Sequence, residues 1–278
     1  MKAIYMMVES QFEAVYTPAT RSKIEEQFGF TGYYPTIEAL QADKEKLGEV
    51  AYLFCGWGVT KLDANLLDLL PNLKVIFYAA GTMKAVLTEE VWERGIRVTT
   101  ANTANAIPVA EYTLANILIS LKNTWQLIQK VKDEKTFRTG LFLPVIGSYQ
   151  STVGIISFSQ VGRMVAALLK PFSINVIAYD PYVSEEEMAK HNVKKVELME
   201  LFQTAHVASL HTPLLESTKG MITREHFQSM PIGATFINTA RGAIVKEEEM
   251  IEVLAVRPDL TAVLDVTNPE PPLADSPL

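Results

Sequence analysis

The feature of this chain that most constrains its fold is a regular alternation of short apolar runs with segments of helical periodicity. Apolar runs of this length suit buried strands, and the segments between them are long enough to cross over a sheet. Such a βαβ rhythm favours parallel sheets with helices on both faces. The predicted strands are residues 3–8, 50–55, 74–78, 97–100, 152–157, 176–179, 207–211, 234–238 and 260–266.

The alternation occurs in two blocks, which predicts two domains. The predicted helices are residues 18–28, 63–70, 88–94, 109–131, 161–170, 184–191, 196–204, 224–229 and 246–256. We place the boundary so that residues 1–101 form the first domain and residues 102–278 form the second. The helix over 109–131 is long enough to bridge domains or to form a subunit contact. Residues 139–150 are predicted to form a loop.

Composition narrows the class of protein. The formal net charge of −7 disfavours a polyanion, so we expect no nucleic-acid partner. The single cysteine, Cys55, lies in an apolar run and is interpreted as a small buried hydrophobe rather than a nucleophile. The N-terminus lacks the features of a signal peptide, and no apolar stretch reaches membrane-spanning length. These features predict a cytoplasmic protein that does not interact with membranes.

The turn after the strand at 152–157 occupies the place of a phosphate-binding loop. A dinucleotide-binding unit carries G-x-G-x-x-G here, for the tight turn, the approach of the pyrophosphate and close helix–strand packing. This chain reads Ser157-Phe158-Ser159-Gln160-Val161-Gly162, so only the third glycine is kept. Backbone N–H groups at the helix start still favour a phosphate. Ser159, Gln160 and Val161 are therefore candidate cofactor contacts, with a pyrophosphate contact weakened or displaced by the Cβ of Ser159.

Asp180 ends the next predicted strand, 18 positions after Gly162 (180 − 162). A carboxylate at that place accepts hydrogen bonds from the adenosine ribose and repels a 2′-phosphate, which favours NAD over NADP. The alternative interpretation is that Asp180 only starts the Asp180-Pro181 turn. The spacing and the strand end favour the cofactor role.

Three further blocks of the second half resemble the D-isomer-specific 2-hydroxyacid dehydrogenases, the family that includes D-3-phosphoglycerate dehydrogenase. The blocks are residues 236–245 (FINTARGAIV), residues 264–271 (LDVTNPEP), and residues 209–214 (SLHTPL) with 218–220 (TKG). The resemblance implies an α/β fold of two doubly wound domains, a flavodoxin-like substrate domain and a Rossmann NAD-binding domain. It also implies hydride transfer between NAD(H) and a small 2-keto or D-2-hydroxy acid, in a homodimer.

The same resemblance implies roles for individual residues of these blocks. Arg241 would be the catalytic arginine that grips the substrate carboxylate and polarises its carbonyl, which suits a planar guanidinium. Glu270 would hydrogen-bond the catalytic histidine and raise its pKa. The implied cofactor contacts are Thr239, Ala240, Asp265, Thr212 and His211, the last in a structural or cofactor-adjacent place. A surface arginine and a solvated loop carboxylate are the plainer interpretations of the two catalytic candidates.

The first half also resembles the family, over residues 73–81 and 95–111. The resemblance implies that the turn with Gly81 and Thr82 offers backbone N–H groups to the substrate carboxylate. Met83 and Lys84 depart from the usual residues just after it. Trp57, between two glycines, is a candidate pocket wall or simply a core residue.

The resemblance ends at residue 278, before the position of the family's catalytic histidine. We therefore expect a truncated chain, and we keep open a non-catalytic NAD-sensing protein or corepressor as the alternative function. A different Rossmann enzyme, such as a methyltransferase, would not account for Arg241 and Glu270 together. No His/Cys spacing typical of a metal site occurs, so no metal is expected.

Overall fold

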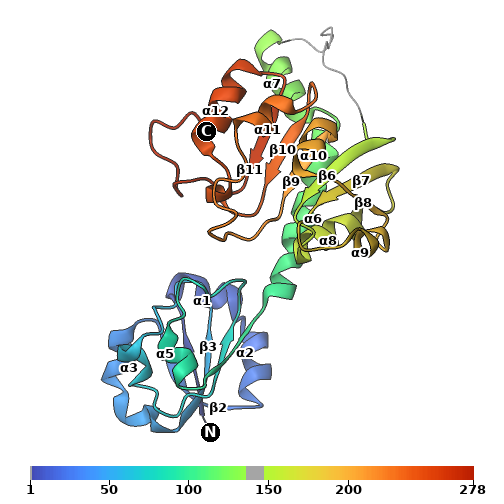
Figure 1. Cartoon of the computed structure of the whole chain (residues 1–278). Coiled ribbons are helices and arrows are strands. Elements are labelled where there is room, and N and C mark those ends of the chain that lie inside the picture. The colour runs from blue at the N-terminus through green and yellow to red at the C-terminus, as the bar shows by residue number, and fades with distance from the viewer. Residues whose placement is uncertain (1, 136–146) are drawn as a thin grey trace. The chain divides into compact units, whose positions relative to one another are not determined.

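The computed structural model describes residues 2–135 and 147–278 (Figure 1). The chain forms two compact units, Met1–Asn105 and Ala106–Leu278, and the division falls in the first turn of helix α6 (Asn102–Ser120). Of the predicted loop over 139–150, residues 139–146 lie outside the described part of the chain. No helix of the described ranges is long and apolar enough to cross a membrane.

The first unit contains a parallel sheet in the order β2-β1-β3-β4-β5. The strands are β1 (Lys2–Met6), β2 (Gly29–Tyr34), β3 (Val50–Cys55), β4 (Val75–Tyr78) and β5 (Arg97–Thr100). This is the flavodoxin-like strand order. The edge strand β2 was not predicted, because its sequence GFTGYY contains two glycines and shows no clear apolar alternation. Every other strand of the unit was predicted.

Helices cover both faces of the first sheet. The helices are α1 (Glu9–Val15), α2 (Pro18–Glu25), α3 (Ile37–Ala42), the 3₁₀ helix η1 (Lys44–Glu49), α4 (Ala64–Leu67) and α5 (Glu89–Glu93). Aliphatic side chains of α3, η1, α4 and α5 form the core on one face. The other face carries an aromatic cluster in which Phe12 packs on Tyr5 and Tyr5 stacks on Phe30. Thr17 is the N-cap of α2, and its hydroxyl accepts a hydrogen bond from Thr20 N at 3.3 Å.

The second unit contains a six-stranded sheet in the order β11-β10-β9-β6-β7-β8, parallel throughout. The strands are β6 (Ser151–Ile156), β7 (Ile174–Tyr179), β8 (Val193–Lys195), β9 (Val207–Leu210), β10 (Thr235–Asn238) and β11 (Thr261–Leu264). The chain winds outward from β6 in one direction and from β9 in the other. This is the strand order of a Rossmann fold, and the two sheets together confirm the predicted α/β class. The three-residue strand β8 was not predicted.

Two helical layers sandwich the second sheet. The helices are α6, α7 (Thr124–Glu134), α8 (Gln160–Leu169), α9 (Glu185–Ala189), α10 (Leu198–Thr204), α11 (Arg224–Ser229), the 3₁₀ helix η2 (Gly242–Ile244) and α12 (Glu247–Val256). Side chains of α10, α11 and α12 form the core on one face, and those of α6, α8 and α9 form it on the other. At Gly154 of β6, an added Cβ would lie 2.5 Å from Leu201 Cδ2 of α10, so this strand residue lets the helix approach closely.

The single helix predicted over 109–131 is wrong in its extent. The structure has two helices, α6 and α7, separated by residues 121–123. Asn123 adopts the left-handed conformation, with φ of 50°, which ends the first helix and redirects the chain. The apolar spacing continued across the break, so periodicity alone did not reveal it.

Candidate functional site

The candidate cofactor residues gather at one edge of the second sheet. The turn with Ser159 follows β6, Asp180 follows β7, His211 follows β9, Thr239 follows β10 and Asp265 follows β11. These positions are all carboxyl ends of parallel strands, which meet at the same edge. In open α/β sheets, ligands bind beyond this edge, at the point where the winding direction reverses. Here that point lies between β6 and β9.

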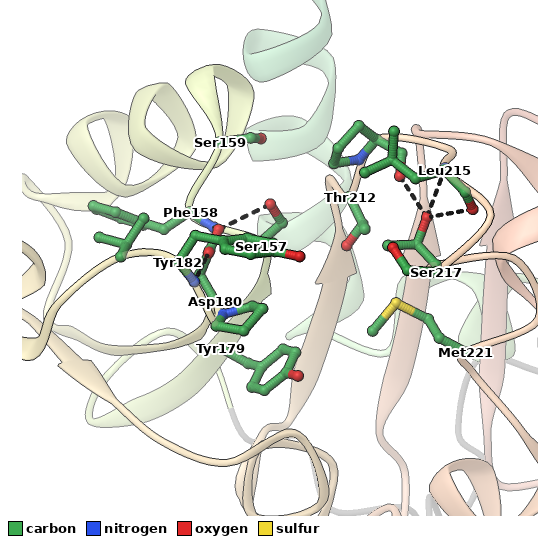
Figure 2. Close-up of a pocket in the computed structure, with 14 residues that line it drawn as sticks. Ser157, Phe158, Ser159, Tyr179, Asp180, Tyr182, Thr212, Leu215, Ser217 and Met221 are labelled. Atoms are coloured by element: carbon green, nitrogen blue, oxygen red, sulfur yellow. Dashed lines mark hydrogen bonds between the residues drawn. The ribbon is translucent and has the colours of Figure 1, made fainter.

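A cavity of about 340 Å³ opens at this switch point. Its lining comes from the last residue of β7 and from the segments after β6, β7 and β9: Ser157, Phe158, Ser159, Tyr179, Asp180, Pro181, Tyr182, Val183, Thr212, Pro213, Leu215, Ser217, Thr218 and Met221. Figure 2 shows the side chains of Ser157 and Asp180 on one side of the space, with those of Thr212 and Met221 facing them. A mostly apolar hollow with a few converging polar groups is the usual form of a small-molecule site.

Asp180 is the buried charge of this cavity, with 6% of its surface exposed. Its Oδ2 accepts hydrogen bonds from the Ser157 hydroxyl at 3.1 Å and from Phe158 N at 2.9 Å (Figure 2). Its Oδ1 accepts one from Tyr182 N at 2.9 Å. These bonds hold the carboxylate in one orientation. Asp180 therefore does more than start a turn, because it also ties the loop after β6 to the loop after β7.

Serines occupy the first two glycine positions of the turn before α8. Ser157 stands at the first glycine place and adopts φ of 74°, the left-handed region that glycine favours. Ser159 caps α8, and its hydroxyl donates to the carbonyl oxygen of His211 at 3.0 Å. The third glycine is required by packing, since a Cβ on Gly162 would lie 2.3 Å from the Ser157 carbonyl oxygen. The chain thus keeps the glycine that its own packing needs.

The first turn of α8 offers a place for a phosphate. Gln160 and Val161 open this ten-residue helix directly after the Ser159 cap. The first N–H groups of an α-helix have no partner inside the helix, and the helix dipole adds positive potential there. An anionic group at this place would therefore be stabilised by the backbone, whatever the side chains.

Thr212 and His211 follow β9 and are both buried. Thr212 lines the cavity, and its hydroxyl donates to the Ile156 carbonyl oxygen at 3.3 Å. The His211 ring is 2.9 Å from the Ser209 hydroxyl, and burial lowers its pKa to about 4. A neutral, hydrogen-bonded ring of this kind is suited to a structural role beside the cavity.

Arg241 lies in the turn between β10 and η2, with an exposed side chain whose Nη1 donates to the Ala240 carbonyl oxygen at 2.6 Å. The turn itself is held firmly. Asn238 Oδ1 accepts from Ala240 N at 3.0 Å, and Asn238 Nδ2 donates to the Arg241 carbonyl oxygen at 3.2 Å. The Thr239 hydroxyl lies 3.3 Å from that of Thr113 on α6. The backbone that carries the Arg241 side chain is therefore held in one conformation.

The segment after β11 packs against this turn. A Cβ on Gly242 would lie 2.0 Å from the carbonyl oxygen of Thr267, so the two backbones are in direct contact. Asn268 N donates to Glu247 Oε2 at 2.7 Å, which fixes the same segment to α12. Asp265 and Glu270 lie on this segment and are exposed. The structure thus brings the blocks that contain Arg241 and Glu270 together.

The substrate candidates of the first unit lie at the carboxyl edge of its sheet. Trp57 follows β3 and is half-exposed, so it is not a core residue. Gly81 and Thr82 follow β4, and the Thr82 hydroxyl accepts from Lys84 N at 3.4 Å. Across the described ranges, no group of three or more His, Cys, Asp or Glu side chains could hold a metal ion.

Comparison with known proteins identifies the family. Residues 114–278 match the model of the NAD binding domain of the D-isomer specific 2-hydroxyacid dehydrogenases. The chain belongs to this family. D-3-phosphoglycerate dehydrogenase of Archaeoglobus fulgidus is 34% identical over 219 residues, which cover 79% of this chain and 41% of that protein. Hydroxypyruvate reductase of Thermotoga maritima is 32% identical over 77% of this chain and 68% of that protein.

The fold of this dehydrogenase family member is also found among solved structures. The NAD-complexed D-isomer specific 2-hydroxyacid dehydrogenase of Lactobacillus delbrueckii ssp. bulgaricus covers 99% of this chain with a TM-score of 0.80, at 20% identity. The comparison covers 82% of that chain. The chain spans about two fifths of the length of the D-3-phosphoglycerate dehydrogenases that it matches.

Several residues of the family member's cavity were not predicted from the sequence. They are Ser157, Phe158, Tyr179, Pro181, Tyr182, Val183, Pro213, Leu215, Ser217, Thr218 and Met221. Ser157 could have been singled out from the sequence. It stands at the first glycine position of the motif, where the tight turn favours a left-handed conformation that serine rarely adopts. Met221 lies well beyond β9 in the chain, and no local pattern distinguishes it from a core methionine.

The buried imidazole of His211 makes the stability of this family member depend on pH. Its pKa is lowered from 6.5 to about 4, so the unfolded chain takes up this proton more readily than the folded one. The stabilisation is complete above pH 6.5 and is lost as pH falls from 6.5 towards 4. We expect a loss of about 3 kcal/mol in the free energy of unfolding over this window. Denaturant titrations at several pH values measure it.

Two variants separate this histidine from the other titrating groups. His211→Gln should remove the His211 part of the pH dependence between 4 and 6.5, while the part due to His226, whose pKa burial also lowers, should remain. His191→Gln, which changes a partly buried ring two residues after α9, is the matched histidine substitution outside the cavity lining. A His211→Gln variant with the parent's full acid dependence would contradict the assignment.

Proposed function

We propose that this chain binds NAD and transfers a hydride between NAD(H) and a small 2-keto or D-2-hydroxy acid. The observation that carries the proposal is the switch-point cavity with the buried, oriented carboxylate of Asp180. A carboxylate at the end of the second strand of a Rossmann unit accepts hydrogen bonds from ribose hydroxyls. The D-isomer specific dehydrogenase of Lactobacillus delbrueckii was solved in an NAD-complexed form, which supports the same cofactor here.

The residues of the cavity fit the parts of NAD. The apolar walls suit an adenine ring, Asp180 suits the adenosine ribose, and the start of α8 suits the pyrophosphate. The Ser159 hydroxyl is engaged by the His211 carbonyl, so we expect it to add no hydrogen bond to the phosphates. We propose NAD rather than NADP, because a 2′-phosphate beside Asp180 would place like charges together.

The remaining candidate residues are proposed to bind the substrate and to assist the hydride transfer. When bound, the nicotinamide supplies or accepts the hydride. We propose that Arg241 binds the substrate carboxylate and stabilises negative charge on the carbonyl oxygen. Glu270 is proposed to hydrogen-bond the imidazole of the family's catalytic histidine, which is the general acid–base. The other proposed contacts are Asp265, Thr239, Ala240, Thr212 and His211 for the cofactor, and Trp57, Gly81 and Thr82 for the substrate.

We further propose a cytoplasmic homodimer with a substrate domain over residues 1–101 and a cofactor domain over residues 102–278. The single buried cysteine supports a reducing compartment. Light scattering of the purified protein at several concentrations measures the oligomeric state.

An NADH-oxidation screen of the full-length protein tests the proposed activity. We expect NADH to be oxidised with at least one of glyoxylate, pyruvate, hydroxypyruvate and bulkier 2-keto acids. NADPH should react at least about tenfold more slowly than NADH. The reason is that repulsion between its 2′-phosphate and the Asp180 carboxylate costs at least about 1.4 kcal/mol. Calorimetric titration of NAD in parallel separates binding from turnover. Binding of NAD with no oxidation across the panel would favour a non-catalytic NAD-sensing protein instead.

A further inference from the structure

The acceptor capacity of Asp180 is largely used within the chain. A carboxylate offers about four acceptor positions. Three hydrogen bonds already reach it, from the Ser157 hydroxyl, from Phe158 N and from Tyr182 N, at 2.9–3.1 Å. These bonds leave about one position on Asp180 for a ligand. The adenosine ribose presents two neighbouring hydroxyls, so one of them needs a different acceptor.

Ser157 offers the missing acceptor. Its hydroxyl hydrogen is directed at Asp180 Oδ2, which leaves the lone pairs of Oγ for another donor. The side chain lines the same cavity and lies beside the carboxylate (Figure 2). The residue holds this place in a left-handed conformation, with φ of 74°, that serine rarely adopts. A glycine would fit this backbone more easily but would provide no oxygen.

We propose that the adenosine ribose is held by two acceptors, the Asp180 carboxylate and Ser157 Oγ. One ribose hydroxyl donates to Asp180, and the other donates to Ser157, which in turn donates to Asp180. Ser157 is then a binding residue that compensates for the internal hydrogen bonds of the carboxylate. This inference rests on the proposed binding of NAD, and it assigns a function to the serine that replaces the first glycine.

Calorimetry with three ligands and three proteins tests the pairing. The ligands are NAD and its two analogues that lack the 2′- or the 3′-hydroxyl of the adenosine ribose. The proteins are the parent, Ser157→Gly and Ser157→Ala. Glycine suits the left-handed backbone, so Ser157→Gly is expected to fold, and circular dichroism checks both variants. The parent should bind each analogue about fivefold more weakly than NAD, the usual effect of one lost hydrogen bond.

In the variants, the expected result differs for the two hydroxyls. Ser157→Gly and Ser157→Ala should bind NAD about fivefold more weakly than the parent. One of the two analogues should then bind each variant as tightly as NAD does. The hydroxyl that it lacks is proposed to lie one hydrogen-bond length beyond the lost Ser157 Oγ, too far to reach the position freed on Asp180. A structural role of Ser157 would instead weaken all three ligands by the same factor, and that outcome overturns the inference.

A control variant and the parent's own behaviour complete the test. Ser151→Ala removes a buried serine hydroxyl from the opposite end of β6, where it donates to the Ser148 carbonyl oxygen at 3.1 Å. It should keep the parent's affinities for all three ligands. Failure of the parent to bind NAD would overturn the proposed function and this inference with it. Binding of NAD with both hydroxyl losses unchanged in Ser157→Gly would overturn this inference alone.

Discussion

Gly242→Ala is expected to lower the free energy of unfolding of the second unit by about 3 kcal/mol. The added Cβ would lie 2.0 Å from the Thr267 carbonyl oxygen and 2.1 Å from its carbon. Backbone atoms cannot rotate away as a side chain can, so the segment after β11 or the turn before η2 must move. Chemical denaturation with circular dichroism measures the loss. The same displacement would separate the blocks that contain Arg241 and Glu270, so activity should fall as well.

A second glycine distinguishes this steric clash from simple backbone strain. Gly233 lies in the same unit at φ of 76°, and a Cβ there would meet its nearest atom, Asn123 Nδ2, only at 3.8 Å. Gly233→Ala should therefore cost only about 1 kcal/mol, the usual penalty of a left-handed residue with a side chain. Equal losses in the two variants would show that contact with Thr267 is not what requires glycine at position 242.

Much of the fold could be predicted from the sequence, because buried parallel strands leave a plain apolar signal. The strands over 50–55 and 97–100 and the helix over 224–229 have the predicted bounds. The strands β2 and β8 were missed, since β2 contains two glycines with no clear apolar alternation and β8 has only three residues. The division of the helix over 109–131 depended on one left-handed residue, Asn123, in an uninterrupted apolar pattern.

The candidate site was predictable where a residue follows a strand. The parallel topology carries the ends of β6, β7, β9 and β10 to one edge, so Asp180 and Arg241 could be assigned from strand ends and motif blocks. The hydrogen bonds of Asp180 could not be predicted, because they depend on the conformation of residue 157. The serine looked like a defect in a glycine motif. In the structure, its hydroxyl donates a hydrogen bond to the Asp180 carboxylate.

Arg241→Gln should reduce kcat/KM for reduction of a 2-keto acid by roughly 10²–10³-fold, the usual effect of removing one preorganised charge-stabilising donor. The guanidinium is proposed to bind the substrate carboxylate through two parallel hydrogen bonds. Arg241 is not among the residues that line the switch-point cavity, so the affinity for NAD should stay within about twofold of the parent's. Steady-state kinetics and calorimetry together measure both effects.

Two further variants separate the shape of the guanidinium from its charge. Arg241→Lys keeps the charge but loses the planar pair of donors, so it should recover less than about tenfold of the lost kcat/KM. Arg224→Gln removes an exposed arginine of the same unit that pairs with Glu252 on α12, and it should leave kcat/KM nearly unchanged. The Arg241 turn is fixed by Asn238 through backbone groups that every variant keeps, so these changes act on the side chain alone. If Arg241→Gln kept more than about a tenth of the parent's kcat/KM, the substrate carboxylate would need a different partner.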